Sequence, residues 1–469
     1  MTSKNVELDS VWLILAAVVG AYVFLFGFLK KINEWYYVFR LGKKKHLSLP
    51  PGDMGWPFVG NMISFLRAFR SKDPDSFINN LVHRYGRTGI YKTSLFGNPS
   101  VIVCGPELSR KILLDDERFE AGYPSSLMKL LGTKSLLGAA NSEHRRLRKL
   151  LVAPINGHEA LSMYIGYIED IVKSSLEECA NYTSPIEFLT EWKKISFNVI
   201  TKIFLGSADS VSESMTEHYG LLLQGAFSPL PFDVPGFMFH RALKARKILL
   251  NFIQPHLDER RYKNGDDQNI ENGIIDQLLE AKDGDGEKLE NELIVNLLFG
   301  FLLAGHETAA HVGVWLTILP SRSSRNPTSC QGRTRGDCKE ETILTKGLNS
   351  QRNQTDGISI KVDGYIIPKG WKVLVWNRGI HKDSEIYSNP NEFLPSRWDN
   401  HTPKAGSFMP FGAGSRTCPG ADLAKIEMCI FIHYFLLNYR FERINPKSPV
   451  KFPSVSPIDN CVARITKLP

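Results

Sequence analysis

Residues 411–420 read F-G-A-G-S-R-T-C-P-G and set a single cysteine into a glycine-rich loop. Gly412, Gly414 and Gly420 permit a tight backbone with positive φ angles, through which amide N–H groups can point at the Cys418 sulfur. A long apolar helix pattern follows at once, so Cys418 precedes a helix N-terminus, where the thiolate form is favoured. The loop is therefore expected to present Cys418 as a metal ligand. A buried structural cysteine in a glycine-rich turn is the alternative.

The loop resembles the haem-binding loop of the cytochrome P-450 family, in which this cysteine is the axial thiolate on the iron. The resemblance implies that Cys418 binds the iron of haem b, that Phe411 packs near the haem and that Arg416 faces a propionate. It also implies the cytochrome P-450 fold, mainly α with small β-sheets, and electrons from NADPH delivered through NADPH-cytochrome P-450 reductase. Residues 49–61, the A-G-H-E-T motif, the F-L-P-S-R-W motif and the C-terminal helix extend the resemblance over most of the chain.

Residues 291–319 are predicted to form a long helix. One face of it carries Leu297, Phe301, Ala304 and Thr308. Ala304 and Gly305 are small enough to let a flat macrocycle and dioxygen approach the backbone, and the Thr308 hydroxyl can reach the Ala304 carbonyl and disturb the helix. The resemblance implies that Thr308 and Glu307 pass protons to dioxygen. Taken alone, a threonine in a buried helix is more often an ordinary core residue.

Residues 143–149, E-H-R-R-L-R-K, form a basic helical turn with His144 and Arg148 four residues apart on one face. In the family an aromatic residue, often Trp, and an Arg at this spacing bind a haem propionate. His144 departs from that pattern, so Arg148 is the stronger candidate. The other basic residues of the turn are expected to form part of a docking surface for an acidic redox partner, and a solvated basic face is the alternative.

The 469 residues are 43% hydrophobic and 23% charged, which suits one large, mostly helical catalytic domain over residues 58–469. Residues 11–29 carry no charge and as a helix span about 28 Å, enough to cross a bilayer once. We expect a retained transmembrane anchor rather than a signal peptide, because Glu7 and Asp9 precede the apolar run and bulky Leu29 ends it.

Basic residues cluster after this run and only Lys4 precedes it. The positive-inside rule therefore predicts a single-pass protein of the endoplasmic reticulum membrane, with residues 1–10 lumenal and the catalytic domain cytosolic. Residues 30–57 are interpreted as a basic collar that contacts lipid headgroups, followed by a proline-rich hinge. No nucleic-acid motif accompanies the net charge of +8, so no nucleic-acid partner is expected. The seven cysteines show no paired spacing, in keeping with a reducing compartment.

Residues 227–239, F-S-P-L-P-F-D-V-P-G-F-M-F, contain three prolines and are too apolar for a solvated loop. They are expected to form a lid at the membrane surface, through which an apolar substrate enters from lipid. Several stretches, among them 155–162 and 365–376, look like those of plant ent-kaurenoic acid oxidases. That likeness implies oxidation of this diterpenoid acid in gibberellin biosynthesis. A related branch that oxidises triterpenoids such as β-amyrin is the alternative.

Residues 321–357 depart from the family. This stretch lacks the E-x-x-R pair that the family keeps here, and it has almost no apolar periodicity. Its richness in Ser, Arg and Gly is typical of a frameshift, missplicing or a faulty gene model, and a genuine low-complexity surface insert is the alternative. Arg397 meets that pair in the family, so here it is expected to be a buried charge without partners, at a cost of about 3–5 kcal/mol.

This departure puts the activity of the chain in question. One alternative function is a non-catalytic remnant that binds haem or lipid. Another is a haem-thiolate isomerase or dehydratase that needs no dioxygen, but Glu307 and Thr308 argue against it, because such an enzyme has no use for a proton relay.

Overall fold

The computed structural model describes most of the chain in two compact units, one formed by Met1–Gly105 with Asn353–Leu374 and the other by Pro106–Arg352 with Val375–Pro469. The described residues are 2–39, 41, 48–71, 73–132, 134–206, 213–226, 228, 231–262, 273–282, 286–323, 351–354, 360–362, 364–399, 401–451 and 455–469. Most of residues 321–357, the stretch predicted to depart from the family, therefore lies outside the described residues.

The first unit begins with a long helix and continues into small sheets. Its helices are α1 (Thr2–Glu34), the π-helical turn η1 (Trp35–Phe39), α2 (Met62–Arg70) and α3 (Ser76–Tyr85). Its strands are β1 (Ile90–Leu95), β2 (Asn98–Val103), β5 (Gln351–Gln354), β6 (Ile360–Val362), β7 (Tyr365–Ile367) and β8 (Lys372–Val375). The strands β1, β2, β8 and β5 lie in that order, and β6 pairs with β7. β1 and β2 form an antiparallel hairpin in which Ile90 lies opposite Val103.

The N-terminal helix has the length and composition of a membrane span over Leu15–Phe39, which extends beyond the predicted run 11–29. The apolar side chains of this helix, among them Val18, Tyr22 and Phe24, are exposed. The C-terminal end of the helix is tied to the rest of the unit, because Glu34 Oε1 accepts a hydrogen bond of 2.5 Å from Lys92 Nζ on β1. Asn33 also donates to the Met54 carbonyl in the hinge.

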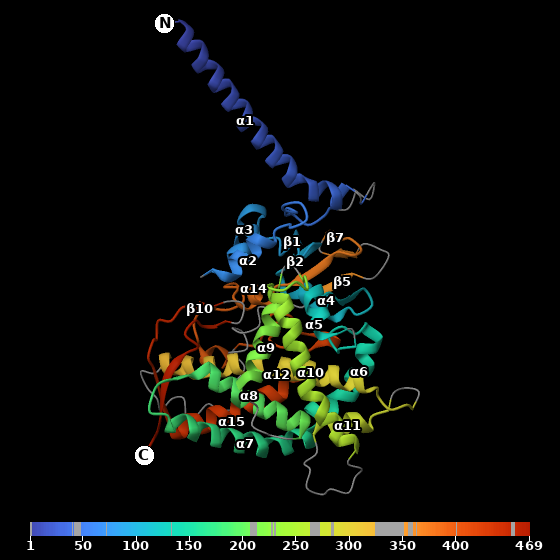
Figure 1. The fold of residues 1–469 in the computed structure, drawn as a ribbon, viewed down its shortest axis with the longest axis vertical. Helices are drawn as coiled ribbons and strands as arrows, with labels where there is room; N and C mark the ends of the chain where they lie inside the picture. The colour runs from blue at the N-terminus through green and yellow to red at the C-terminus, as the bar shows by residue number, and fades with distance from the viewer. Residues whose placement is uncertain are drawn as a thin grey trace. The chain divides into compact units, whose positions relative to one another are not determined.

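The second unit is mostly helical (Figure 1). Its longer helices are α4 (Pro106–Leu114), α6 (Asn141–Asn156), α7 (His158–Asn181), α8 (Phe188–Leu205), α9 (Glu213–Ala226), α10 (Met238–Tyr262), α12 (Asn291–Ser323) and α15 (Ala421–Asn438). Shorter helices are α5 (Ser125–Leu131), α11 (Ile274–Glu280), α14 (Asn377–His381), η4 (Pro395–Trp398) and η5 (Gly414–Arg416). Strands are short: β3 (Phe119–Ala121), β4 (Ile186–Glu187), β9 (Tyr439–Arg443), β10 (Val450–Lys451), β11 (Ser456–Pro457) and β12 (Val462–Lys467).

The core of this unit is built around α12, with α7, α8 and α15 side by side near it (Figure 1). α12 is as apolar as a membrane span but is largely buried, so it is a core helix. Gly313 allows α8 to approach closely, because a Cβ there would lie 2.4 Å from the Trp192 ring. The Trp192 ring in turn lies 3.9 Å from that of Phe431 on α15. β12 is central in its sheet, with Ala463 opposite both Ile186 and Arg443. The predicted mainly α fold with small sheets is confirmed.

Candidate active site

The Cys418 loop is closed by hydrogen bonds within itself. The Cys418 N–H donates to the Phe411 carbonyl at 2.9 Å, and the Thr417 hydroxyl donates to the Gly414 carbonyl at 2.6 Å. Gly412 and Gly414 have φ angles of 78° and 75°, as predicted for a tight loop. α15 begins three residues after the cysteine, so its N-terminus follows the loop as predicted. Every residue of the loop is partly exposed.

The prediction for Gly420 is wrong in its conformation. Gly420 has φ −97° and lies at the start of α15, so any residue can adopt its backbone there. A Cβ at Gly420 or at Gly412 would meet no heavy atom within 4 Å. At Gly414 a Cβ would lie 2.1 Å from the Leu113 carbonyl oxygen on α4. Gly414 is therefore required by packing, whereas Gly412 and Gly420 border open space.

Helix α6 holds the loop from one side. Arg148 donates a hydrogen bond to the carbonyl of Thr417, directly before the cysteine. Burial lowers the pKa of Arg148 and the nearby Cys418 sulfur opposes that shift, so the guanidinium and the sulfur are close enough to interact. Asn156, at the end of α6, donates to the Pro419 carbonyl. His144 is buried on the same helix.

Arg416 ties the loop to the segment before α6. Its Nη2 donates to the Ala139 carbonyl at 2.7 Å and to Asn141 Oδ1 at 3.1 Å. The ring of Phe411 lies 5.6 Å from the Lys425 ammonium on α15. These contacts position both side chains at the edge of the loop.

On α12, the Thr308 hydroxyl donates to the Ala304 carbonyl at 2.7 Å, as predicted. The predicted disturbance of the helix is absent from the described part of α12, since the helix is continuous from Asn291 to Ser323. Ala304 is exposed and Thr308 partly exposed, although the residues around them are buried. A buried helix therefore opens onto free space at Ala304.

Gly305 was predicted to make room for a macrocycle and dioxygen, but its neighbour in the structure is another helix. A Cβ at Gly305 would lie 2.7 Å from Ile200 Cδ1 on α8. The glycine thus permits close packing of two helices, and only Ala304 borders the open space.

Glu307 points toward α8 rather than into the space beside Thr308. Its carboxylate accepts a hydrogen bond of 2.8 Å from Lys193 Nζ, and only 5% of its side chain is exposed. Burial raises the pKa of Glu307, whereas His306, Lys193 and His311 lower it, and the balance lies below the usual value. Burial also lowers the pKa of His306 to about 4, so His306 is neutral at pH 7 and Lys193 supplies the lasting positive charge.

The expectation that Arg397 is a buried charge without partners is wrong. Arg397 is partly exposed, and its guanidinium donates to the carbonyls of Ser388, Asn389 and Glu392. It also lies 5.9 Å from the Tyr387 ring. The penalty of an unpaired buried charge therefore does not apply here.

The apolar segment between α9 and α10 is described from residue 231 onward. Residues 231–237 are not helical, and Phe232, Val234 and Phe237 expose about half of their surface. α10 begins at Met238, inside the predicted lid 227–239. The non-helical, apolar character of the segment is confirmed over these residues.

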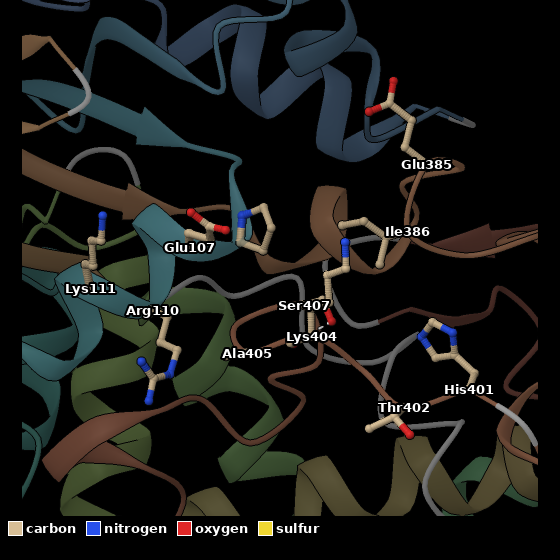
Figure 2. Close-up of a pocket in the computed structure, with 11 residues that line it drawn as sticks. Glu107, Arg110, Lys111, Glu385, Ile386, His401, Thr402, Lys404, Ala405 and Ser407 are labelled. Atoms are coloured by element: carbon tan, nitrogen blue, oxygen red, sulfur yellow. Dashed lines mark hydrogen bonds between the residues drawn. The ribbon is translucent and has the colours of Figure 1, made fainter.

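A pocket of about 620 Å³ lies between α4 and residues 385–407 (Figure 2). None of its lining residues belongs to the Cys418 loop or to α12. Arg110 and Lys111 point in opposite directions in Figure 2, and Glu385 lies apart from both. Its charged side chains do not converge on a common position, so we do not assign it as the active site.

Comparison with known proteins decides the family. The Cytochrome P450 family model matches residues 50–319 and 347–458. The chain is a member of the cytochrome P-450 family.

Named relatives of this cytochrome P-450 are plant enzymes. It is 49% identical to 7,8-epoxymelianol synthase of Ailanthus altissima, with 99% of this chain and 98% of the relative covered. It is 46% identical to ent-kaurenoic acid oxidase 2 of Arabidopsis thaliana, with 94% of each chain covered. The retinoic-acid-bound cyanobacterial CYP120A1 has the same fold, with a TM-score of 0.79 at 24% identity over 90% of this chain and 100% of that chain.

Cytochromes P-450 are haem-thiolate monooxygenases that receive electrons from NADPH through a reductase, and the residues present fit such a group. The small side chain of Ala304 is exposed on a largely buried helix, as contact with a flat macrocycle requires. The absence of protein atoms near a Cβ at Gly412 and Gly420 leaves the Cys418 loop accessible on that side.

Sequence reasoning missed Lys193 and Asn156. Lys193 lies 114 positions before its partner Glu307, and Asn156 lies 263 positions before Pro419. No short motif links residues at such separations. Only the packing of α8 on α12 and of α6 on the loop reveals them.

Proposed function

We propose that this chain is a monooxygenase of a terpenoid, in which the Cys418 thiolate would hold the haem. The observation that carries the proposal is the Cys418 loop, closed by the Cys418 N–H to Phe411 carbonyl bond and open to solvent along its length. The bound haem would supply dioxygen activation, in which one oxygen atom enters the substrate and the other leaves as water, with two electrons from NADPH.

Residues of the loop and of α6 would hold the group. Arg148 and His144 would face it from α6, with Arg148 as a propionate ligand. Arg416 would contribute a second propionate contact while keeping its bond to Ala139, and Phe411 would pack at its edge. Gly412, Gly414 and Gly420 shape the loop. On α12, Ala304 would border the group, whereas Gly305 allows α12 to pack on Ile200 of α8.

Thr308 and Glu307 would deliver protons. The two groups have different partners in the structure, since Thr308 bonds to Ala304 and Glu307 to Lys193. Because the structure shows no hydrogen bond between these two side chains, protons would pass between them through water. The low pKa of Glu307 makes it a carboxylate at rest, which would accept a proton before donating one.

The substrate is proposed from the relatives. The likeness to ent-kaurenoic acid oxidase 2 favours ent-kaurenoic acid, a diterpenoid acid of gibberellin biosynthesis. The likeness to the beta-amyrin 11-oxidase of Glycyrrhiza uralensis, at 45% identity over 97% of this chain, favours a triterpenoid such as β-amyrin. Reconstitution with a reductase, NADPH and labelled dioxygen distinguishes them. We expect the enzyme to insert one labelled oxygen atom into one of the two compounds. If no terpenoid gives a labelled product, the proposal is contradicted.

We further propose that residues 321–357 impair the enzyme. The family model leaves residues 320–346 unmatched, between two matched stretches. The alignment with the 7,8-epoxymelianol synthase has 491 positions, more than the 469 residues of this chain, so parts of that relative have no counterpart here. The unmatched residues 320–346 support a damaged or mispredicted segment, and sequencing the transcript across it is the direct check.

We propose that α1 anchors the protein in the endoplasmic reticulum membrane with the catalytic domain in the cytosol. The exposed apolar side chains of α1 and of residues 231–237 support contact with lipid. Asn181, in the sequon Asn-Tyr-Thr, is exposed at the end of α7. A cytosolic domain leaves Asn181 unglycosylated, and glycosidase-sensitive mass at Asn181 would overturn this topology.

A further inference from the structure

A buried polar cluster lies on the side of α12 that faces α8 and α9. It contains Tyr219 on α9 and His306 and Glu307 on α12, and Lys193 on α8 closes it toward solvent. Tyr219 and His306 are fully buried, and their rings lie 4.8 Å apart. Helices α8, α9 and α12 all belong to the second unit (Figure 1).

Two polar atoms of this cluster make no hydrogen bond within the described residues: Tyr219 Oη and His306 Nε2. Buried polar atoms without a partner are rare in folded proteins, because each loses its hydrogen bonds to water on folding. Two such atoms on rings whose centroids lie 4.8 Å apart point to a shared partner rather than to two independent losses.

The chemistry of each atom is fixed by its surroundings. His306 Nδ1 lies 2.8 Å from the Leu302 carbonyl, so Nδ1 carries the proton and donates it to that oxygen. Nε2 of the neutral ring is therefore an acceptor. Tyr219 Oη is a donor that can also accept. Glu307 Oε1 lies 3.9 Å from His306 Nε2, and both atoms are acceptors, so they cannot bond directly.

We propose that Tyr219, His306 and Glu307 bind one buried water molecule, and that this water orients the Glu307 carboxylate. The water accepts the Tyr219 O–H and donates its two protons to His306 Nε2 and Glu307 Oε1. Three hydrogen bonds are what a buried water typically makes. Oε1 has a second lone pair for the 2.8 Å bond from Lys193, so the water and the lysine bind it together.

The backbone of α9 closes the site, since a Cβ at Gly220 would lie 3.9 Å from Glu307 Oε1. The charged and titratable groups that face the carboxylate are then Lys193 from α8 and His306 and His311 from α12. The assignment makes Tyr219 and His306 positioning residues for Glu307. Their effect on turnover rests on the proposed function, in which Glu307 supplies protons, whereas the water site itself does not.

The test compares Tyr219→Phe with the control Tyr164→Phe in the full chain. Tyr164 is another buried tyrosine, and its hydroxyl donates to the Pro154 carbonyl at 2.8 Å on α6, away from the site. If Tyr219 donates to a bound water, both variants lower the unfolding midpoint, because each loses a hydrogen bond and leaves an acceptor with fewer partners. If the Tyr219 hydroxyl has no partner, Tyr219→Phe removes a desolvated group and raises the midpoint. A raised midpoint would overturn the water site.

A double-mutant cycle of Tyr219→Phe with His306→Leu gives a second measure. A shared water makes the two changes non-additive, and additive effects would overturn the proposal. Electron density for an atom within hydrogen-bond distance of Tyr219 Oη, His306 Nε2 and Glu307 Oε1 is the direct observation.

The positioning role is read from the fate of NADPH electrons in the reconstituted enzyme. We expect Tyr219→Phe to raise severalfold the share of electrons that reduce dioxygen to hydrogen peroxide, with Tyr164→Phe unchanged. A lowered midpoint with an unchanged peroxide share would refute the positioning role. Suppose that the chain oxidises no terpenoid, while Tyr219→Phe still lowers the unfolding midpoint and the double-mutant cycle is still non-additive. The proposed function would then be refuted, and the water site would remain supported.

Discussion

The Lys193 ammonium on α8 and the Glu307 carboxylate on α12 lie 2.8 Å apart, with 24% of the lysine side chain and 5% of the glutamate side chain exposed. This ion pair joins α8 and α12, two core helices that approach each other closely at Gly313 and Gly305. Lys193 also helps to keep Glu307, the proposed proton donor, in its carboxylate form. The stability of the core and the chemistry of the site therefore depend on the same contact.

Replacing Lys193 by Met should destabilise the protein by about 3 kcal/mol at pH 7, because a buried carboxylate is left without its cation. The pKa of Glu307 lies below its usual 4.5 in the folded state, so the pair stabilises above pH 4.5 and this contribution is lost as the pH falls below that value. The difference between wild type and Lys193→Met should therefore shrink at pH 4. Chemical unfolding at both pH values measures it, and an equal difference at both would contradict the ion-pair account.

Glu427 on α15 should show the opposite pH dependence. It is buried, and burial raises its pKa to about 7 although Ser196 Oγ donates to it at 2.6 Å. Between pH 4.5 and pH 7 the folded state binds more protons than the unfolded state, so stability falls as the pH rises. Between pH 4.5 and pH 7, the free energy of unfolding of wild type should fall by about 3 kcal/mol relative to that of Glu427→Gln. The matched control is Glu177→Gln, an exposed residue paired with Lys467, which should show no such loss.

Thr308→Ala should retain haem but divert electrons from NADPH into hydrogen peroxide. The hydroxyl borders the open space at Ala304 and supplies no contact to the Cys418 loop among the described residues. Binding of the group and delivery of protons are therefore separate tasks. Haem content and peroxide yield are measured together, and loss of haem in this variant would show that Thr308 has a structural role instead.

Much of the fold could be predicted because its signals are local. Three features can each be read from one continuous segment of the sequence: the apolar run that ends at Leu29, the helix pattern that begins at Asn291 and the loop around Cys418. The Thr308 to Ala304 bond was also predictable, since both partners lie on one helix.

The errors concern contacts between distant segments. Gly305 is small because of Ile200 on α8, a neighbour that the sequence around Gly305 does not reveal. Arg397 was expected to be unpaired because its family partners are missing, but it bonds to carbonyls of its own loop instead. Backbone acceptors are available to any arginine, and no side-chain pattern predicts which ones it takes.

Replacing residues 321–357 by the corresponding stretch of an intact ent-kaurenoic acid oxidase should increase haem content and NADPH use with substrate. Since Arg397 already has acceptors, the gain should come from restoring the segment that the family model leaves unmatched, rather than from Arg397 itself. Haem per protein in the two chains measures this. If the unmodified chain binds haem stoichiometrically and oxidises ent-kaurenoic acid as fast as the repaired chain, the segment is not damaging.

The most direct test of the haem-thiolate assignment is the reduced carbon monoxide difference spectrum of the full chain, of Cys418→Ala and of Cys104→Ala. Only Cys418 lies in the loop that α6 holds through Arg148, whereas Cys104 lies in the first unit. We predict the thiolate band in the full chain and in Cys104→Ala, and its complete loss in Cys418→Ala. An unchanged band in Cys418→Ala would contradict the assignment of Cys418 as the haem ligand.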